Sequence, residues 1–237
     1  MNSRSPQREA HRLDGVLDLV KEALNASAAL IYWIDSTYGS PLASDSGAAR
    51  FIAGYNDGMG RFDPINVHSV VEDGRPVAFL QQRLGGSVTP DTARYAKFMR
   101  DTGFANAATI VLRDEGEPLI GIGVMKTLAD PPATAETEVV ADAIRRYLER
   151  ELIFNPAVRQ RYLARKLTTR FGLSPREVEV MNLIADGAAN HDISVALGIG
   201  AATVKTHLQR SFDKLGVGSR AAAMRMLLEP KSWLRPG

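Results

Sequence analysis

The chain has 237 residues, of which 45% are hydrophobic and 24% are charged, a composition typical of a folded protein and too apolar for a disordered one. It contains no cysteine, which excludes disulfides, thiolate nucleophiles and cysteine zinc sites. The net charge of +2 conceals an asymmetry. Residues 1–158 carry 16 basic and 21 acidic side chains, a net −5, whereas residues 159–237 carry 13 and 6, a net +7. A basic C-terminal third is typical of a polyanion-binding domain joined to a different kind of domain.

No apolar stretch approaches the roughly 20 residues that a membrane-spanning helix requires. The N-terminal residues also lack the apolar core of a signal peptide. We therefore expect a cytoplasmic chain without membrane contact. Its length is sufficient for two domains, each with its own core.

The first two thirds of the chain mix helical and strand patterns. The spacing of apolar residues and the positions of Gly and Pro predict the elements. These are a helix over 11–25, a strand over 28–34, a helix over 91–102, a hairpin of strands over 107–112 and 118–125, and a helix over 134–153. An antiparallel hairpin among helices is typical of the α+β class.

The C-terminal region carries the strongest local pattern. Ser174 is suited to cap a helix that begins at Pro175, and Glu177 stands at the capping-box position. Gly187 is suited to end that helix. Three further helices are predicted over 190–197, 201–215 and 220–228, with a tight turn at 198–200.

The helix predicted over 201–215 has two different faces. The residues at the spacing of a buried face are Val204, Leu208, Phe212 and Leu215. The residues that face away from the core are Thr203, Lys205, Thr206, Gln209 and Arg210. Lysine can donate to guanine, and glutamine can pair with adenine, in the major groove. The pattern favours DNA binding, and the alternative is a helical packing module that binds protein.

This region resembles the LuxR-type DNA-binding domain. The matching residues are Leu173 to Glu177, Gly187, Ile193, Leu197 to Ile199, Thr203 to Leu208, Lys214 to Val217, Ser219 and Arg220. The resemblance implies that Lys205, Thr206 and Gln209 reach base edges or phosphates. It also implies that the DNA backbone is held by Thr203, His207, Arg210, Lys214 and Arg220. Gly200 departs from the family, which usually has Ser or Thr as the cap of this helix.

The same domain can follow a phosphoryl receiver, which needs clustered acidic residues after its first strand. Here the strand over 28–34 is followed by the single carboxylate Asp35, and the elements do not alternate as βαβ. A receiver is therefore not expected.

Residues 12–155 instead resemble the autoinducer-binding domain of quorum-sensing LuxR proteins, an α-β-α sandwich related to GAF and PAS domains. The resemblance rests on Tyr55 with Asp63-Pro64, on the helix that leads through Phe98 to Thr109, and on the hairpin through Gly121 and Gly123. It implies that a ligand is bound by Phe51, Tyr55, Asp63 and Phe79. Trp33 is a further candidate, because Tyr32 and Trp33 alternate on the strand over 28–34 and one of them should face the interior. For each aromatic residue, a place in the core is the alternative.

Both tryptophans that contact the lactone head group in that family are absent. Phe51 cannot donate the hydrogen bond that an indole makes. We therefore expect a small molecule other than a standard acyl-homoserine lactone. The alternatives are a regulator that needs no ligand and uses this domain only to dimerise or bind a partner, and a true acyl-homoserine-lactone receptor.

No pattern of residues indicates catalysis, a metal site or a cofactor. The four histidines are scattered, and Gly85-Gly86 lacks the flanking pattern of a phosphate loop. We expect a sensing and dimerisation domain over 12–155, a linker over 156–168, and an all-α, four-helix, helix-turn-helix domain over 169–237. The expected partners are double-stranded DNA, a small molecule and a second copy of the chain.

Overall fold

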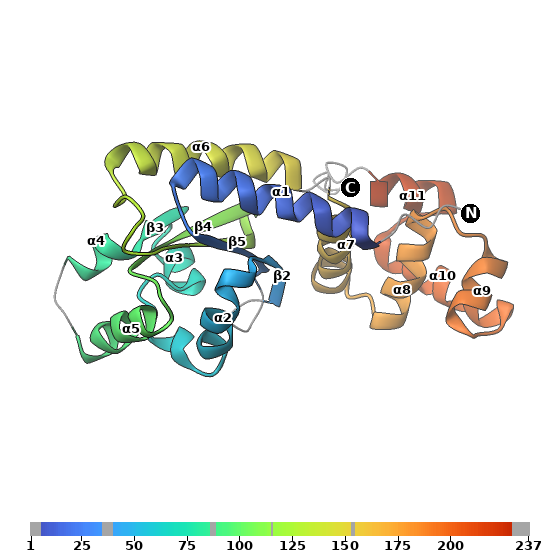
Figure 1. Cartoon of the computed structure of the whole chain (residues 1–237). Coiled ribbons are helices and arrows are strands. Elements are labelled where there is room, and N and C mark those ends of the chain that lie inside the picture. Colours follow the sequence, from blue (N-terminus) through green and yellow to red (C-terminus); the bar gives the residue numbers. More distant parts are fainter. Residues whose placement is uncertain (1–5, 35–39, 86–88, 115, 153–154, 229–237) are drawn as a thin grey trace. The chain divides into compact units, whose positions relative to one another are not determined.

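The computed structural model describes residues 6–34, 40–85, 89–114, 116–152 and 155–228. The chain divides into two compact units, Met1–Asn155 and Pro156–Gly237 (Figure 1). Among the helices of the described ranges, none combines the length and the apolar character needed to cross a lipid bilayer.

A five-stranded antiparallel sheet forms the centre of the first unit. Its strands are β1 (Ala28–Trp33), β2 (Ser40–Ser44), β3 (Val77–Phe79), β4 (Asn106–Asp114) and β5 (Glu117–Lys126). Their order in the sheet is β2-β1-β5-β4-β3, so β1, β5 and β4 lie between the two edge strands. The predicted central strand and the predicted hairpin are both confirmed, and the hairpin is β4 followed by β5.

Helices cover both faces of this sheet. The helices of the first unit are α1 (Pro6–Leu24), α2 (Ala49–Asn56), α3 (Val67–Glu72), α4 (Leu80–Leu84), α5 (Pro90–Asp101) and α6 (Ala135–Glu151), with the short 3-10 helices η1 (Ser46–Ala48) and η2 (Met59–Phe62). Figure 1 shows α1 and α6 side by side on one face, with α2, α3 and α5 on the other. The predicted α-β-α sandwich is confirmed.

Strand pleating assigns neighbouring residues of β1 to opposite faces of the sheet. Tyr32 belongs to the apolar core on the side of α2 and α5. It lies directly opposite Gly121 of β5. A side chain on Gly121 would collide with the Tyr32 ring, so glycine at this position lets the ring lie across the sheet.

In the described part of the second unit, residues 156–228, every regular element is a helix, as the fold prediction expected. It consists of α7 (Pro156–Phe171), α8 (Pro175–Ala185), α9 (Asn190–Leu197), α10 (Ala201–Leu215) and α11 (Arg220–Leu228). The predicted capping box is present, since the Ser174 amide donates to Glu177 Oε2 at 2.8 Å.

The segment over 156–168, which the sequence predicts as a linker, is helical in the structure. It lies within α7, and its residues Leu163 and Leu167 are buried in the same apolar core as α8, α10 and α11. Both side chains recur at helical spacing, so they place one face of α7 in this core. The helical domain therefore includes α7.

Candidate functional site

The helix-turn-helix is formed by α9, a tight turn and α10. Gly198 adopts a left-handed conformation (φ 63°) that ends α9, and Gly200 is the extended residue before α10. The Ile199 amide donates to the Ser194 carbonyl at 3.1 Å, which closes the turn. Glycine supplies the left-handed conformation without steric cost, so the sharp angle between the two helices follows from the local sequence.

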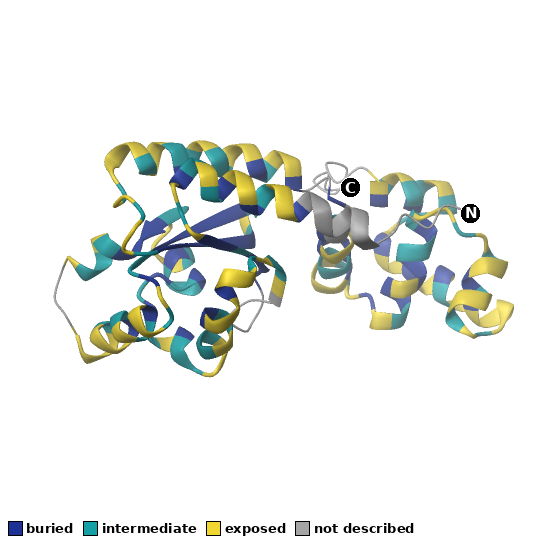
Figure 2. Cartoon of the chain, in the orientation of Figure 1, coloured by how far each residue is buried: buried dark blue, intermediate teal, exposed yellow. Residues whose placement is uncertain are grey.

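Burial determines which face of α10 is available to a partner. Val204, Leu208 and Leu215 are buried in the core of the second unit. Figure 2 shows the buried positions of α10 on its inner side and the exposed positions on its outer side. The exposed side chains of α10 are those of Ala201, Ala202, Thr203, Lys205, Thr206, Gln209, Arg210, Asp213 and Lys214.

Six of the eight predicted DNA-contacting residues are exposed on α10. They are Thr203, Lys205, Thr206, Gln209, Arg210 and Lys214. Lys205 and Arg210 form no ion pair with another described residue, so their charges face solvent. His207 is half-buried, and its Nδ1 has no hydrogen-bond partner in the described part of the chain.

The ammonium group of Lys214 forms hydrogen bonds within the domain. Its Nζ donates to Glu177 Oε2 at 2.7 Å and to the Gly172 carbonyl at 2.9 Å. Burial acts to raise the pKa of the Glu177 carboxyl, but hydrogen bonds from Lys214 and Ser174 outweigh it and hold that pKa below its usual value. Lys214 therefore ties the end of α10 to the start of α8.

Arg220 also forms hydrogen bonds within the domain. Its guanidinium donates to the Ala188 carbonyl and, at 3.5 Å, to Asn190 Oδ1. These acceptors flank the start of α9, so Arg220 fixes the loop between α8 and α9. The resemblance predicts phosphate contacts for Lys214 and Arg220. In the structure, each side chain also donates to acceptors within the domain that local sequence could not show.

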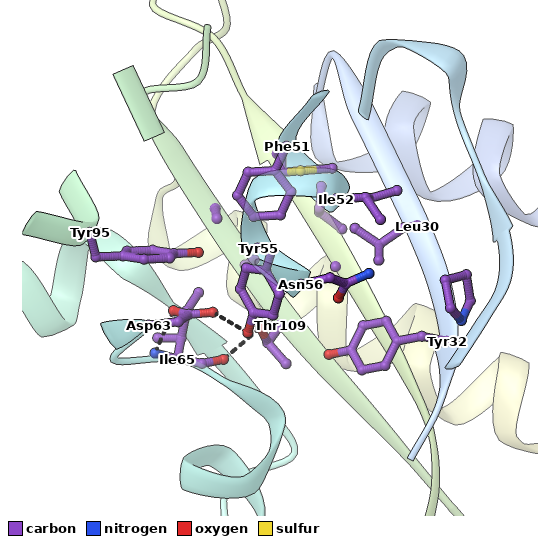
Figure 3. A pocket seen from close by; sticks show the side chains of 16 residues that line it. Leu30, Tyr32, Phe51, Ile52, Tyr55, Asn56, Asp63, Ile65, Tyr95 and Thr109 are labelled. Carbon is purple, nitrogen blue, oxygen red and sulfur yellow. Dashed lines mark hydrogen bonds between the residues drawn. The ribbon is translucent and has the colours of Figure 1, made fainter. Parts of the chain in front are cut away.

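The first unit contains a pocket between the sheet and the helices on the side of α2 and α5 (Figure 3). The cavity has a volume of about 50 Å³ and is partly open to solvent. Its wall includes Leu30 and Ile52, and polar side chains gather on the side of Asp63. A mostly apolar cavity with a few convergent polar groups is typical of a small-molecule site.

Asp63 is the centre of the polar side. The Tyr55 hydroxyl donates to its Oδ2 at 2.9 Å, the Ile65 amide donates to its Oδ1 at 3.0 Å, and the Tyr95 hydroxyl is a third donor close to this carboxylate. The residue is only 6% exposed. Burial raises the pKa of the Asp63 carboxyl to about 6, against the opposing effect of these three donors.

Tyr32 and Thr109 extend the polar side across the sheet. The hydroxyls of Tyr32 and Thr109 both line the pocket, and Thr109 Oγ1 donates to the Ile65 carbonyl at 2.8 Å. Burial raises the pKa of the Tyr32 hydroxyl, so the group remains a neutral donor. Figure 3 shows Tyr32, Tyr55 and Tyr95 around the same space.

Aromatic rings form the remaining wall. The ring centroids of Phe51 and Tyr55 are 5.4 Å apart, and those of Tyr55 and Tyr95 are 6.5 Å apart in an edge-to-face arrangement. Phe98 packs behind Phe51 at 5.3 Å. Contacts at these distances stabilise a wall beyond its buried area.

The structure brings together three of the five residues predicted to bind a ligand. Phe51, Tyr55 and Asp63 line the pocket, whereas Trp33 and Phe79 do not. Each of these two is buried beside neighbours that belong to the pocket-side core, Tyr32 in β1 and Ala78 with Leu80 around β3. Because side chains alternate along a strand, Trp33 and Phe79 point to the opposite face of the sheet.

Three lining residues that carry a hydroxyl group, Tyr32, Tyr95 and Thr109, are not among the residues predicted to bind a ligand. The alternation of Tyr32 and Trp33 indicated that one of the two faces the interior, but not which. Tyr95 lies in the helix predicted over 91–102, where local sequence does not show a pocket residue. Its contact with Asp63 joins segments far apart in the sequence.

Comparison with known proteins gives a partial match. The family "Bacterial regulatory proteins, luxR family" matches residues 172–227. Response regulator protein VraR of Staphylococcus epidermidis is 36% identical over 94 residues, which are 38% of this chain and 45% of that protein. Probable transcriptional regulatory protein NarL of Mycobacterium tuberculosis is 52% identical over 52 residues, 22% of this chain and 24% of that protein. The chain thus spans less than half the length of these curated relatives.

Two solved structures are also similar at low identity. Escherichia coli SdiA has a TM-score of 0.44 and 15% identity, over 96% of this chain and 94% of that chain. The GAF domain/HD domain protein from Geobacter sulfurreducens has a TM-score of 0.45 and 12% identity, over 60% of this chain and 90% of that chain. The family match itself covers α8 to α11, which include the turn and the outer face of α10. Residues 172–227 of this chain are a helix-turn-helix domain of the luxR family of bacterial regulatory proteins.

Proposed function

We propose that the chain is a ligand-responsive regulator that binds specific DNA sequences through the outer face of α10. The observation that carries this proposal is that exposed Lys205, Gln209 and Arg210 share one face of the second helix of a luxR-family helix-turn-helix. The net charge of +7 over residues 159–237 supports attraction to a polyanion. The proposal assigns no catalytic step to the chain.

The side chains of α10 have different roles in this proposal. Lys205, Thr206 and Gln209 face base edges in the major groove, where their donors and acceptors can distinguish base pairs. Thr203, His207 and Arg210 contact the DNA backbone and fix the orientation of the helix. Lys214 and Arg220 act inside the domain.

A mobility shift on DNA from the promoter of the chain's own gene tests this assignment. Lys205→Ala and Gln209→Ala should each weaken binding by about fivefold or more, because a good base contact contributes about 1–3 kcal/mol. Asp186→Ala is a suitable control, since Asp186 is exposed on the C-cap of α8 rather than on α10. Wild-type affinity in both α10 variants would refute the assignment.

The pocket supports the sensing part of the proposal. Its apolar and aromatic wall favours a small, partly apolar molecule, and the polar side near Asp63 favours a group that hydrogen-bonds. Phe51 offers no hydrogen-bond donor to such a ligand. This supports a ligand other than a standard acyl-homoserine lactone.

Thermal unfolding of the purified chain with a panel of small amphipathic molecules tests ligand binding, because a ligand raises the unfolding temperature of the state that it binds. Tyr55→Phe should reduce the shift, since it removes a hydroxyl of the polar side while keeping the ring. A shift that is equal in the variant would place the ligand elsewhere.

One observation favours the second candidate, a regulator that works without a ligand. The Asp63 carboxylate already accepts from Tyr55 at one oxygen and from Ile65 at the other, so both of its oxygens have a partner within the protein. If no compound of the panel changes the unfolding temperature while DNA binding is intact, this candidate replaces the first.

We also propose that two copies of the chain pair through the outer face of α1 and α6. Leu19, Val139 and Tyr147 are large apolar side chains on these helices, and they are 40%, 67% and 55% exposed. A groove between the helices is lined by residues that include Val16, Leu19 and Tyr147. Exposed acidic side chains on α1, such as Glu22, and exposed arginines on α6, such as Arg150, can pair between copies.

A further inference from the structure

The outer face of α10 contains one acidic side chain, Asp213. It follows Thr206 and Gln209 at intervals of seven and four residues, which places all three on the same stripe of the helix. Asp213 is exposed like the other two. A carboxylate on a face that approaches phosphates opposes binding through its charge. A favourable effect of Asp213 on DNA recognition would therefore have to come from a contact that it makes.

Asp213 makes such a contact with a proposed base-reading residue. Gln209 Nε2 donates to Asp213 Oδ1 at 2.8 Å, across one turn of the helix. A carboxylate can only accept hydrogen bonds, so the amide nitrogen, not the amide oxygen, must face Asp213. The contact thereby determines which way the carboxamide of Gln209 is turned. Gln209 Oε1 and the second N–H of Nε2 remain available to a partner.

We propose that Asp213 is a positioning residue that makes Gln209 selective for adenine over guanine. Adenine presents the N7 acceptor and the N6 donor, which match one N–H and the oxygen of a glutamine amide. Guanine presents two acceptors, N7 and O6. With one N–H of Gln209 held by Asp213, the side chain has only one donor left for guanine, and its oxygen faces another acceptor. The inference rests on the proposed docking of α10 in the major groove.

The test uses the full chain and a duplex selected by the wild-type protein from a randomised DNA pool. All four base pairs are then placed at each position of that duplex, and relative affinities are measured by competition. At the base pair that Gln209 contacts, the Gln209→Ala variant should lose the sequence preference that the wild type shows, and this loss identifies the position. At that position the wild type should prefer adenine over guanine.

Two substitutions separate positioning from charge. Asp213→Ala should reduce the adenine preference by about twofold or more, the factor expected from losing a Gln–Asp contact across one helical turn. Asp213→Asn should keep the preference, because its amide oxygen still accepts from Gln209. Asp186→Ala removes one negative charge from the same unit without touching α10, and it should leave the preference unchanged.

Several results would overturn the inference. The first is an adenine preference that is the same in Asp213→Ala as in the wild type. The second is a loss of adenine preference in Asp213→Asn that equals the loss in Asp213→Ala, because that result would assign the effect to charge. A change only at a different base pair would mean that Asp213 reads a base directly. If the wild type selects no sequence from the pool, the proposed function itself fails, and this inference fails with it. Unfolding temperatures of the variants confirm that each is folded.

Discussion

The Asp63 carboxyl is buried, which raises its pKa, and it lies beside three hydrogen-bond donors, which lower its pKa. The net shift makes the stability of the folded chain depend on pH. The pKa of Asp63 is about 6 in the folded chain and 3.8 for the free side chain. Because the folded state holds the proton more tightly, Asp63 favours folding most below pH 4, and this contribution is lost as the pH rises to about 6. Above that pH, folding carries a cost of about 2–3 kcal/mol for the buried charge.

Substitution of Asp63 by Asn should remove this dependence, because the amide does not titrate and still has an oxygen for the Ile65 amide. Between pH 4 and pH 6.5, the unfolding temperature of the wild type should fall relative to that of Asp63→Asn. Thermal melts of both proteins across this range measure the difference between their unfolding temperatures. The contributions of the other titrating groups are the same in both proteins and cancel in this difference. Parallel curves would show that the folded-state pKa of Asp63 is not raised.

Among the elements, the end of α10 is joined to the start of α8 by the ion pair of Lys214 with Glu177. Loss of the Lys214 side chain leaves Glu177, whose side chain is 5% exposed, without its cation. We expect Lys214→Ala to destabilise the second unit by about 1–3 kcal/mol, the cost of an unpaired buried charged group. Lys205→Ala should leave stability unchanged while it weakens DNA binding.

Chemical denaturation and DNA titration of these two variants measure both quantities. If Lys214→Ala unfolds like the wild type but binds DNA more weakly, Lys214 acts mainly as a phosphate contact and not through stability.

The close approach of β1 and β5 gives a second prediction at the level of elements. Gly121→Ala places a methyl group against the Tyr32 ring and should cost about 1–3 kcal/mol through strain. Gly15→Ala is the matched control, because nothing lies near its added methyl group and Gly15 is inside α1. That control should stabilise by about 0.5–1 kcal/mol. Equal melting temperatures for the two variants would contradict the described packing of Tyr32.

The elements that can be predicted from the sequence are those determined by interactions between residues close together in the chain. The capping box of Ser174 and Glu177, and the glycine that ends α9, are visible because the interacting groups lie within a few residues of each other. The pocket was only half predicted, since the choice between Tyr32 and Trp33 depends on which face of the sheet α2 and α5 cover. The role of Lys214 also required a partner 37 residues away.

For the whole molecule, the face of α1 and α6 should control assembly. Val139→Glu introduces a charge into the proposed contact between two copies, and we expect it to shift the chain from dimer to monomer. Leu128→Glu is the matched control, because Leu128 is 91% exposed in the loop before α6. Sedimentation of both variants and the wild type measures the assembly state. A dimer that persists in Val139→Glu would exclude this face.

Two copies of α10 related by a two-fold axis should reach successive major grooves on one side of the duplex. Hydroxyl-radical footprinting of the wild-type chain on its selected duplex tests this most directly. We predict two protected segments whose centres are about 10 base pairs apart, and loss of both in Lys205→Ala at the same protein concentration. A single protected segment, or a footprint unchanged by Lys205→Ala, would contradict the proposed reading of DNA by paired copies of α10.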